Sequence, residues 1–366
     1  MDLIIFIVAL SILVLVHELG HFLMAKWNGI RIEEFGLGLP PRLFGKRIGE
    51  TIYSLNALPI GGFVRMYGED PSFIEESGNG KRETRSKQKN KNRSFAYKKP
   101  WQKFLVVVGG VLMNLVLAVT IFAVVYGVLG VPTETNQVKV VGVVEGSPAD
   151  KSGLEEGVVI LEVGGVKIEN PNQLTDEVAK YKGKEVILGV KNLEGQVQDL
   201  PVQVRENPPE GEGSMGVAIS NVEMVKIKWW EFYKGIAAGF KEAYFWGKII
   251  GGGVISMVGG LFMGRVPSDV SGPIGIYQAT SSIKQSQGMW ALLHFFGVVS
   301  VNLAVVNILP FPALDGGRII FVVYEMLFRK RANQKLEIMV NNIGMLVLLT
   351  LIVVITAGDV LRIIRK

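Results

Sequence analysis

The first 25 residues constrain this chain most, because they join an apolar run of membrane length to a cluster of ionisable side chains. Residues 3–15 and 22–25 are almost wholly apolar, and the segment Val16-His-Glu-Leu-Gly-His21 lies between them. About 20 apolar residues span a bilayer as a helix. Ionisable groups at that depth are unfavourable and usually functional. The sequence therefore predicts a membrane-spanning helix, residues 1–25, that carries a chemical site.

The histidines of this segment have the spacing of metal ligands. His17 and His21 are four residues apart, so they lie on one face of a helix and both imidazoles can reach one ion. Glu18 can take a proton from water activated by that ion. This is the His-Glu-x-x-His pattern of zinc hydrolases. The chain has 3 histidines and two are in the motif. The alternative is a helix that carries three polar residues for packing.

Composition indicates a membrane protein with aqueous parts. Of the 366 residues, 49% are hydrophobic and 20% are charged, and the mean hydropathy is +0.33. An ordinary soluble domain is less apolar than this. The chain has no cysteine, so any zinc must be held by His and carboxylate side chains.

The charged residues are distributed unevenly along the chain. Residues 26–103 contain 16 basic and 8 acidic residues, whereas residues 132–230 contain 10 basic and 16 acidic ones. Positive charge accumulates in cytoplasmic loops, so the first region is expected inside and the second outside. No nucleic-acid partner is expected, because a solvated loop near anionic lipid explains the basic run from Lys81 to Lys99.

The apolar segments predict a polytopic α-helical membrane protein with four transmembrane helices. The second contains Gly109-Gly110 and Asn114, small and polar residues of the kind that let helices approach closely. The four predicted spans cover residues 1–25, 104–130, 290–328 and 338–360.

Residues 26–103, between the first two spans, are predicted to begin with a β element. Ile52–Leu55 and Phe63–Tyr67 are short β-like pieces separated by Gly and Pro, which favours a membrane-associated hairpin or small sheet at 30–67. An exposed strand edge there could hold an extended substrate segment. A hairpin that only packs fits the pattern equally well. Residues 72–99 are polar without period, so a mobile loop is expected.

Residues 229–275 are the most ambiguous part of the chain. The stretch 243–264 is apolar enough to be scored as a span. A full crossing there would put Asp315 at the membrane surface opposite His17, too far away to share a metal ion. We therefore expect an amphipathic or re-entrant element at the outer interface.

The third span contains a break close to a carboxylate. Pro310 and Pro312 precede Asp315-Gly-Gly, and prolines free backbone groups that need partners or water. Such a stretch is expected to line a cavity. Asp315 is the best candidate for a third zinc ligand. Its alternative role is to cap the helix that follows.

Residues 137–206 are predicted to form an extracytoplasmic α+β domain. The stretch Gly146-Ser-Pro-Ala-Asp-Lys-Ser-Gly-Leu-Glu-Glu-Gly157, followed by Gly164-Gly165, resembles the signature of bacterial PDZ domains. The resemblance implies a groove for an extended peptide or a chain end. A steric filter without a ligand is the alternative.

Three motifs in one order extend the resemblance to nearly the whole chain. His-Glu-Leu-Gly-His in the first span, the PDZ-like region, and Asn-x-x-Pro-x-Pro-x-x-Asp-Gly in the third span resemble the site-two protease family, in particular its bacterial single-PDZ branch. The resemblance implies Glu18 as the catalytic base. The implied zinc ligands are His17, His21 and Asp315. The implied substrate-binding residues are Asn302, Asn307, Pro310 and Pro312. Asn307 would contact either the developing oxyanion or the substrate backbone.

The function implied by this resemblance is that of an intramembrane zinc metalloprotease with Zn²⁺ as cofactor. Its expected partners are the lipid bilayer and single-span membrane proteins already trimmed outside, such as anti-sigma factors, or signal-peptide remnants. The expected location is the bacterial cytoplasmic membrane, with the site towards the cytoplasm. Two rivals remain: a non-enzymatic PDZ-bearing membrane scaffold, and a membrane-anchored zinc protease that acts on soluble substrates.

Overall fold

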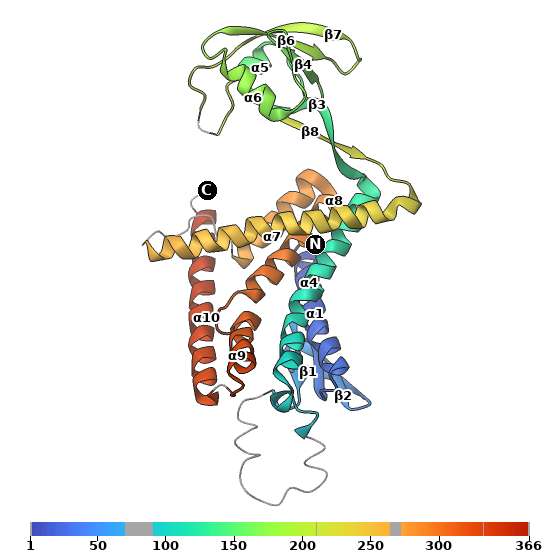
Figure 1. Cartoon of the computed structure of the whole chain (residues 1–366), viewed down its shortest axis with the longest axis vertical. Coiled ribbons are helices and arrows are strands. Elements are labelled where there is room, and N and C mark those ends of the chain that lie inside the picture. Colours follow the sequence, from blue (N-terminus) through green and yellow to red (C-terminus); the bar gives the residue numbers. More distant parts are fainter. Residues whose placement is uncertain (1, 70–90, 210, 264–271, 332, 365–366) are drawn as a thin grey trace, which may run out of the picture. The chain divides into compact units, whose positions relative to one another are not determined.

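The computed structural model describes residues 2–69, 91–209, 211–263, 272–331 and 333–364. Its contacts divide the chain into two compact units. Unit 1 comprises residues 1–126 and 230–366, and unit 2 comprises residues 127–229. Unit 1 contains the long helices and one sheet, and unit 2 contains a second sheet with two short helices (Figure 1).

Among the described residues, four helices of unit 1 are long and apolar enough to cross a membrane, the number that the sequence predicts. The four candidate spans are Asp2–Trp27, Pro100–Leu129, Pro273–Ile308 and Leu336–Asp359. The first three are whole helices, and the fourth is the apolar part of a longer helix. The helices of unit 1 are α1 (Asp2–Trp27), α4 (Pro100–Leu129), α7 (Phe232–Phe262), α8 (Pro273–Ile308), α9 (Asp315–Phe328) and α10 (Gln334–Ile364).

The predicted third span, 290–328, is not a single helix in the structure. Helix α8 already begins at Pro273, and it ends at Ile308. A break containing Pro310 and Pro312 separates α8 from α9, as expected where proline removes backbone donors. The predicted start of this span, residue 290, is too late because residues 277–287 are largely polar. Gly288 adopts a non-helical conformation inside α8 (φ 83°) and marks the join between this polar part and the apolar part.

Helices α1 and α4 pack backbone to backbone, as the small residues of α4 predict. A Cβ atom on Gly20 would lie 2.1 Å from the carbonyl oxygen of Gly109. Neither helix has room for a side chain at this crossing. Helix α8 joins α4 nearby, because the buried Ser300 hydroxyl donates a hydrogen bond to the carbonyl oxygen of Asn114 (2.8 Å). The three helices thus meet close to the level of His17.

The predicted β element is an antiparallel sheet formed by β1 (Ile32–Ile48) and β2 (Thr51–Met66). Both predicted strand pieces lie at least in part in β2, but the strands are longer than predicted. One stretch of β1 lies between two stretches of β2. Residues 34–37 of β1 pair both with 52–55 and with 62–65, and residues 42–48 pair with 51–56. Phe22 of α1 packs on Phe35 with ring centroids 5.1 Å apart. Of the predicted mobile loop, residues 72–90 lie outside the described residues, whereas Phe95–Tyr97 form a short 3-10 helix.

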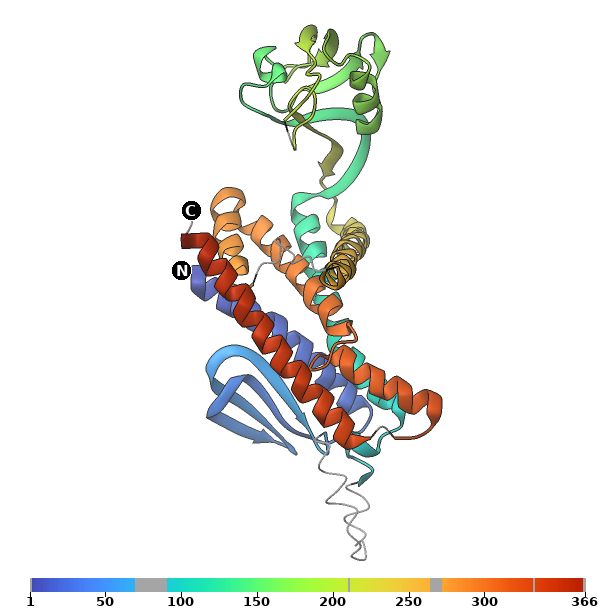
Figure 2. The same ribbon diagram turned by 90° about the vertical axis from the view of Figure 1, so that its left-hand side faces the viewer.

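Helix α7 is not among the four candidate spans, and it runs across the other long helices of unit 1 instead of along them (Figures 1 and 2). Three exposed lysines, Lys234, Lys241 and Lys248, recur every seventh residue. The side chain of Glu242 joins α7 to α8, because its Oε1 lies 3.1 Å from Nε2 of His294. The position of α7 at the membrane interface stays a prediction.

Unit 2 is larger than the predicted range 137–206. The strand Val217–Val225 pairs with Val131–Val143; the first lies wholly after residue 206, and the second begins before residue 137. The sequence did not reveal this pairing, because the paired residues are 74 to 94 positions apart. The strands are β3 (Val131–Val143), β4 (Val159–Val163), β5 (Val166–Lys167), β6 (Glu185–Lys191), β7 (Val197–Gln203) and β8 (Val217–Val225), in the order β7-β6-β4-β3-β8 with β5 beside β4.

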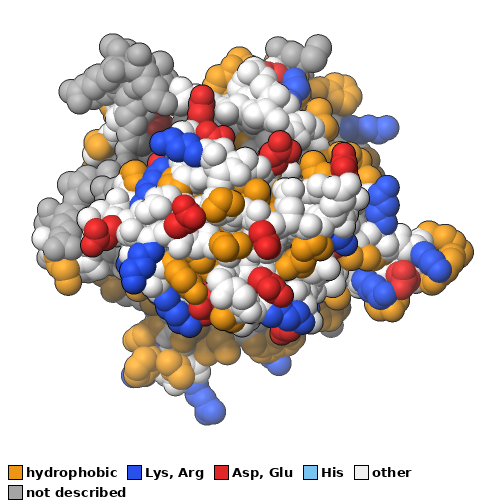
Figure 3. All heavy atoms as spheres, turned by 90° about the horizontal axis from the view of Figure 1, so that it is seen from above, with side chains coloured by type: hydrophobic (Ala, Val, Ile, Leu, Met, Phe, Trp, Pro, Cys, Tyr) orange, Lys and Arg blue, Asp and Glu red, His pale blue; other side chains and the backbone are white. Residues whose placement is uncertain are grey.

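Two short helices, α5 (Pro148–Lys151) and α6 (Pro171–Ala179), complete unit 2. Ile160 of β4, Leu174 of α6 and Leu188 of β6 are almost fully buried in its core. Viewed from above, acidic and basic side chains are interspersed over its visible face (Figure 3). That face therefore has no continuous patch of only positive or only negative charge.

Candidate metal centre

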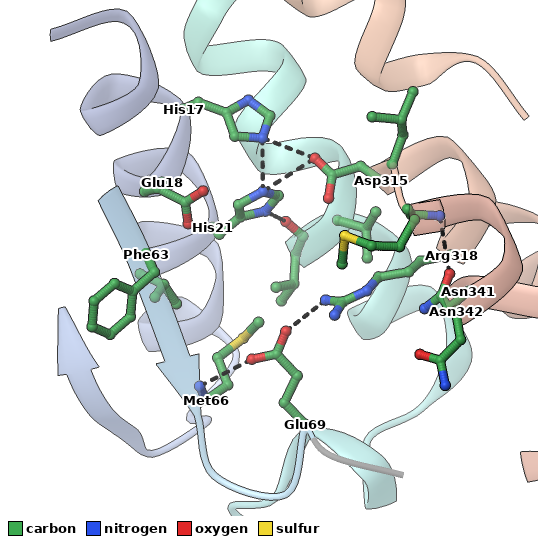
Figure 4. A pocket seen from close by; sticks show the side chains of 16 residues that line it. His17, Glu18, His21, Phe63, Met66, Glu69, Asp315, Arg318, Asn341 and Asn342 are labelled. Atoms are coloured by element: carbon green, nitrogen blue, oxygen red, sulfur yellow. Dashed lines mark hydrogen bonds and ion pairs between the residues drawn. The ribbon is translucent and has the colours of Figure 1, made fainter. Parts of the chain in front are cut away.

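Three side chains from the two ends of the chain converge in unit 1 (Figure 4). Nε2 of His17 lies 2.9 Å from Oδ2 of Asp315, and Nε2 of His21 lies 3.2 Å from the same oxygen. The two Nε2 atoms are 3.1 Å apart. Corners of a zinc tetrahedron with ligand bonds of about 2.1 Å are about 3.4 Å apart. The three atoms are thus spaced almost as three ligands of one zinc ion.

The break between α8 and α9 directs Asp315 into this cluster. Ala313, just before α9, has φ 72°, a left-handed conformation that non-glycine residues rarely adopt. Its amide donates a hydrogen bond to Oδ1 of Asn341 on α10 (3.1 Å). Asp315 is the first residue of α9, so the turn held by Asn341 fixes the direction from which its carboxylate enters the site.

The second histidine is held in the tautomer that a metal ligand needs. Nδ1 of His21 lies 2.8 Å from the carbonyl oxygen of Val106. A carbonyl oxygen can only accept, so Nδ1 carries the proton. The lone pair of Nε2 therefore faces His17 and Asp315. Backbone carbonyls commonly orient metal-bound histidines in this way.

The first histidine has a buried amide partner, Asn114 on α4. Nδ2 of Asn114 lies 3.3 Å from Nδ1 of His17, and Oδ1 of the same amide is buried without a hydrogen-bond partner. A half-turn of the amide exchanges these two atoms with little change in shape. Oδ1 would then accept the Nδ1 proton of His17. This arrangement satisfies the orphaned oxygen and leaves Nε2 of His17 free to bind a cation.

The residues present fit a zinc ion. Oδ2 of Asp315 is buried and lacks a hydrogen-bond partner, although two imidazole nitrogens lie within 3.2 Å of it. A carboxylate oxygen and two nitrogen lone pairs repel one another unless a cation or a proton lies between them. Two His and one carboxylate form a known zinc set that leaves a fourth position open.

Gly110 of α4 forms the wall against which the imidazoles rest. A Cβ atom there would lie 2.6 Å from Nε2 of His21 and 2.7 Å from Cε1 of His17. Only glycine leaves room for both rings. The sequence suggested Gly110 as a helix-packing residue, but it did not reveal this contact with the rings.

The cluster opens into a cavity of about 390 Å³, large enough for a short peptide segment. Glu18 lines it beside the two imidazoles (Figure 4). Strand β2 contributes Phe63, Val64 and Met66 to the lining, and α10 contributes Asn341, Asn342 and Met345. Asn302, Asn307, Pro310 and Pro312 are not among the lining residues. The structure therefore brings the three predicted ligands and Glu18 together, but not the four residues assigned to the substrate.

An ion pair between Arg318 and Glu69 also lines the cavity. Nη1 of Arg318 lies 2.5 Å from Oε1 of Glu69, and the backbone amide of Met66 donates to Oε2 of Glu69 (3.2 Å). The pair joins the end of β2 to α9, one turn beyond Asp315. Sequence reasoning missed it, because no local pattern connects residues so far apart.

The Arg318–Glu69 pair is expected to matter for activity through its geometry. We expect Glu69→Gln and Arg318→Gln each to lower activity about tenfold, since close charge pairs couple by roughly 1–2 kcal/mol. The exchanged pair Glu69→Arg with Arg318→Glu should recover part of that loss. A double-mutant cycle on reporter cleavage measures the coupling. Additive losses without recovery would show that the pair does not hold β2 against α9.

Asn114 is expected to support zinc binding through His17. Asn114→Leu keeps the volume but removes the partner of Nδ1, so we expect zinc affinity to fall about 10- to 100-fold. Competition with a chromophoric chelator measures this affinity on purified protein. Asn302→Leu on α8 is the matched control and should bind zinc as the wild type does. Equal affinities in all three proteins would exclude an orienting role for Asn114.

Comparisons with known proteins give a consistent result. The model of peptidase family M50 matches residues 5–351. A protein of Clostridium perfringens named as a zinc metalloprotease is 36% identical over 364 residues, covering 97% of each chain. Zinc metalloprotease RasP of Geobacillus kaustophilus is 28% identical over 421 residues, covering 97% of this chain and 96% of the relative.

One solved structure, the PDZ domain of an SdrC-like protein from Listeria innocua, matches part of the chain. It covers 23% of this chain and 92% of its own, with 21% identity and a TM-score of 0.21. No shared fold follows from so low a score.

Proposed function

The chain belongs to peptidase family M50, and from that premise we propose that it hydrolyses peptide bonds within or beside the transmembrane segments of other proteins. Its relatives are named zinc metalloproteases, and the chain is accordingly a zinc metalloprotease with several membrane-spanning helices. One observation carries the proposal. The donor atoms of His17 and His21 lie on a helix long and apolar enough to cross a membrane, so the proposed chemistry would take place at membrane depth.

In the proposed mechanism, His17, His21 and Asp315 would hold the ion and Glu18 would move protons. When bound, Zn²⁺ supplies a Lewis acid that polarises the scissile carbonyl and acidifies a water molecule. Glu18 would accept the proton of the attacking water and pass it to the leaving amide nitrogen. The Val106 carbonyl and the Asn114 amide would keep the two imidazoles in the tautomers that this task needs.

The edge of β2 is the proposed holder of the substrate. A peptide bond inside a helix is shielded by its own hydrogen bonds, so the substrate must unwind before cleavage. Residues 62–66 pair with residues 32–37 on one side, and no strand among the described residues pairs with their other side. Phe63, Val64 and Met66 also line the cavity, which supports pairing of an extended substrate at this edge. Asn302 and Asn307 in the last turns of α8, and Pro310 and Pro312 in the break after it, stay proposed substrate contacts.

The finer proposal is that the substrates are single-span proteins trimmed outside, such as anti-sigma factors. Unit 2 would lie outside a bacterial cytoplasmic membrane and would bind a peptide or act as a size filter. The excess of acidic residues at 132–230 and of basic residues at 26–103 supports this orientation.

The test compares one scissile segment in two settings. The segment is placed in a single-span reporter in vesicles and in a soluble fusion protein, and each is incubated with the purified wild type and with a chelator-treated sample. We expect zinc-dependent cleavage of the membrane reporter. Cleavage of the soluble form alone would favour the protease with soluble substrates. A protein that binds zinc but cleaves neither form would favour the scaffold.

A further inference from the structure

Unit 1 contains a second cavity that shares no lining residue with the metal centre. Its volume is about 500 Å³. It lies between the start of α4 and the end of α9 with the turn that follows. The lining residues are Lys98, Pro100, Trp101, Lys103, Glu325, Met326, Arg329, Lys330 and Arg331.

The walls of this basic cavity carry an unbalanced charge. Of its five cations, Lys103 is neutralised by Glu325, since Nζ lies 2.8 Å from Oε2 and both side chains are largely buried. The other four are Lys98, Arg329, Lys330 and Arg331, and Glu325 is the single carboxylate among the described residues of the lining. Four like charges around one hollow repel one another unless an anion lies among them.

The local backbone gathers these cations. Arg329, the residue directly after α9, has φ 52°, so the chain turns sharply there and presents three consecutive basic residues to the same cavity. The guanidinium of Arg331 lies 4.8 Å from the centre of the Tyr97 ring. Burial lowers the pKa of the Lys98 ammonium, and the nearby charge of Arg93 lowers it further. An anion in the cavity would offset both effects.

The cavity is located where a lipid headgroup would be found. Helix α4 is a candidate membrane span that begins at Pro100, and the next residue, Trp101, is 49% exposed. Tryptophan at the end of a span is typical of the headgroup level. Arginine and lysine are the side chains that bind phosphate oxygens.

We propose that the basic cavity binds the phosphate headgroup of an anionic phospholipid. Free phosphate shares this chemistry, but Trp101 and the end of a span favour a lipid source. The site lies at the end of α9 opposite to Asp315. A bound headgroup would therefore fix the far end of the helix whose first residue is the proposed zinc ligand.

The experiment measures lipid retention by native mass spectrometry of the full-length protein, released from micelles that contain phosphatidylglycerol or phosphatidylcholine. The test variant is Arg329→Gln with Lys330→Gln. At about fivefold per cation near a membrane surface, we expect about 25-fold weaker retention of phosphatidylglycerol from the loss of two cations. The control variant, Lys46→Gln with Arg47→Gln, removes two exposed adjacent charges from β1 of the same unit and should change retention less than threefold.

Two further arms distinguish the alternatives. The charge-conserving variant Arg329→Lys with Lys330→Arg should retain phosphatidylglycerol like the wild type, and its zinc content should match that of the glutamine variant. Equal retention by the wild type and the glutamine variant would overturn the proposal, and so would an equal loss in the β1 control. Displacement of the lipid by millimolar inorganic phosphate would assign the site to a soluble ligand instead.

Discussion

Replacing Glu18 with glutamine is expected to lower proteolysis 100- to 10,000-fold, the range that a general base contributes, while zinc stays bound. The amide has the same size as the carboxylate but cannot accept the proton of the attacking water. Glu18 supplies none of the three clustered donor atoms, so the ion should be unaffected. Cleavage of the single-span reporter and the zinc content of the same preparation measure both effects.

Glu223→Gln is the matched control for this prediction. It makes the same chemical change at an exposed position of β8 in unit 2, and it should leave cleavage unchanged. A Glu18→Gln protein that cleaves at the wild-type rate would refute the assigned role of Glu18. Loss of both zinc and activity would instead make Glu18 a metal ligand, contrary to the proposed mechanism.

Gly110→Ala is expected to abolish stoichiometric zinc binding and, with it, all cleavage. The new methyl group would lie 2.6 Å from Nε2 of His21 and 2.7 Å from Cε1 of His17. Both rings would have to leave the positions from which they face Asp315. Alanine is a better helix former than glycine by about 1 kcal/mol, so the helix itself should persist. Elemental analysis of purified protein, beside circular dichroism, separates metal loss from unfolding.

Gly251→Ala on α7 provides the control for that substitution. It is the same change within a helix, and a Cβ atom there would have nothing within 4 Å. We expect normal zinc content and normal cleavage from it. A Gly110→Ala protein with one zinc per chain would show that the imidazoles do not rest against α4 as the structure has them.

Much of the site could be predicted, but its residues needed different kinds of argument. His17 and His21 followed from helix periodicity alone, because contacts between residues i and i+4 depend only on the local backbone. Asp315 needed two further arguments: its place after the prolines of a broken helix expected to line a cavity, and the resemblance to a family. Asn302 and Asn307 were assigned to the substrate by resemblance, and the structure does not bring them to the lining of the cavity.

The sequence by itself determined which segments are long and apolar enough to span a membrane, where prolines break a helix, and that two imidazoles share one helix face. Only the tertiary structure decided what surrounds those imidazoles. The contacts of Gly110, Asn114 and Val106 with the rings depend on how α4 is rotated and how closely it approaches α1. The pairing of β8 with β3 and of Arg318 with Glu69 likewise joins distant residues. Hydrophobic periodicity records which face of an element is apolar, but it does not record which partner covers that face.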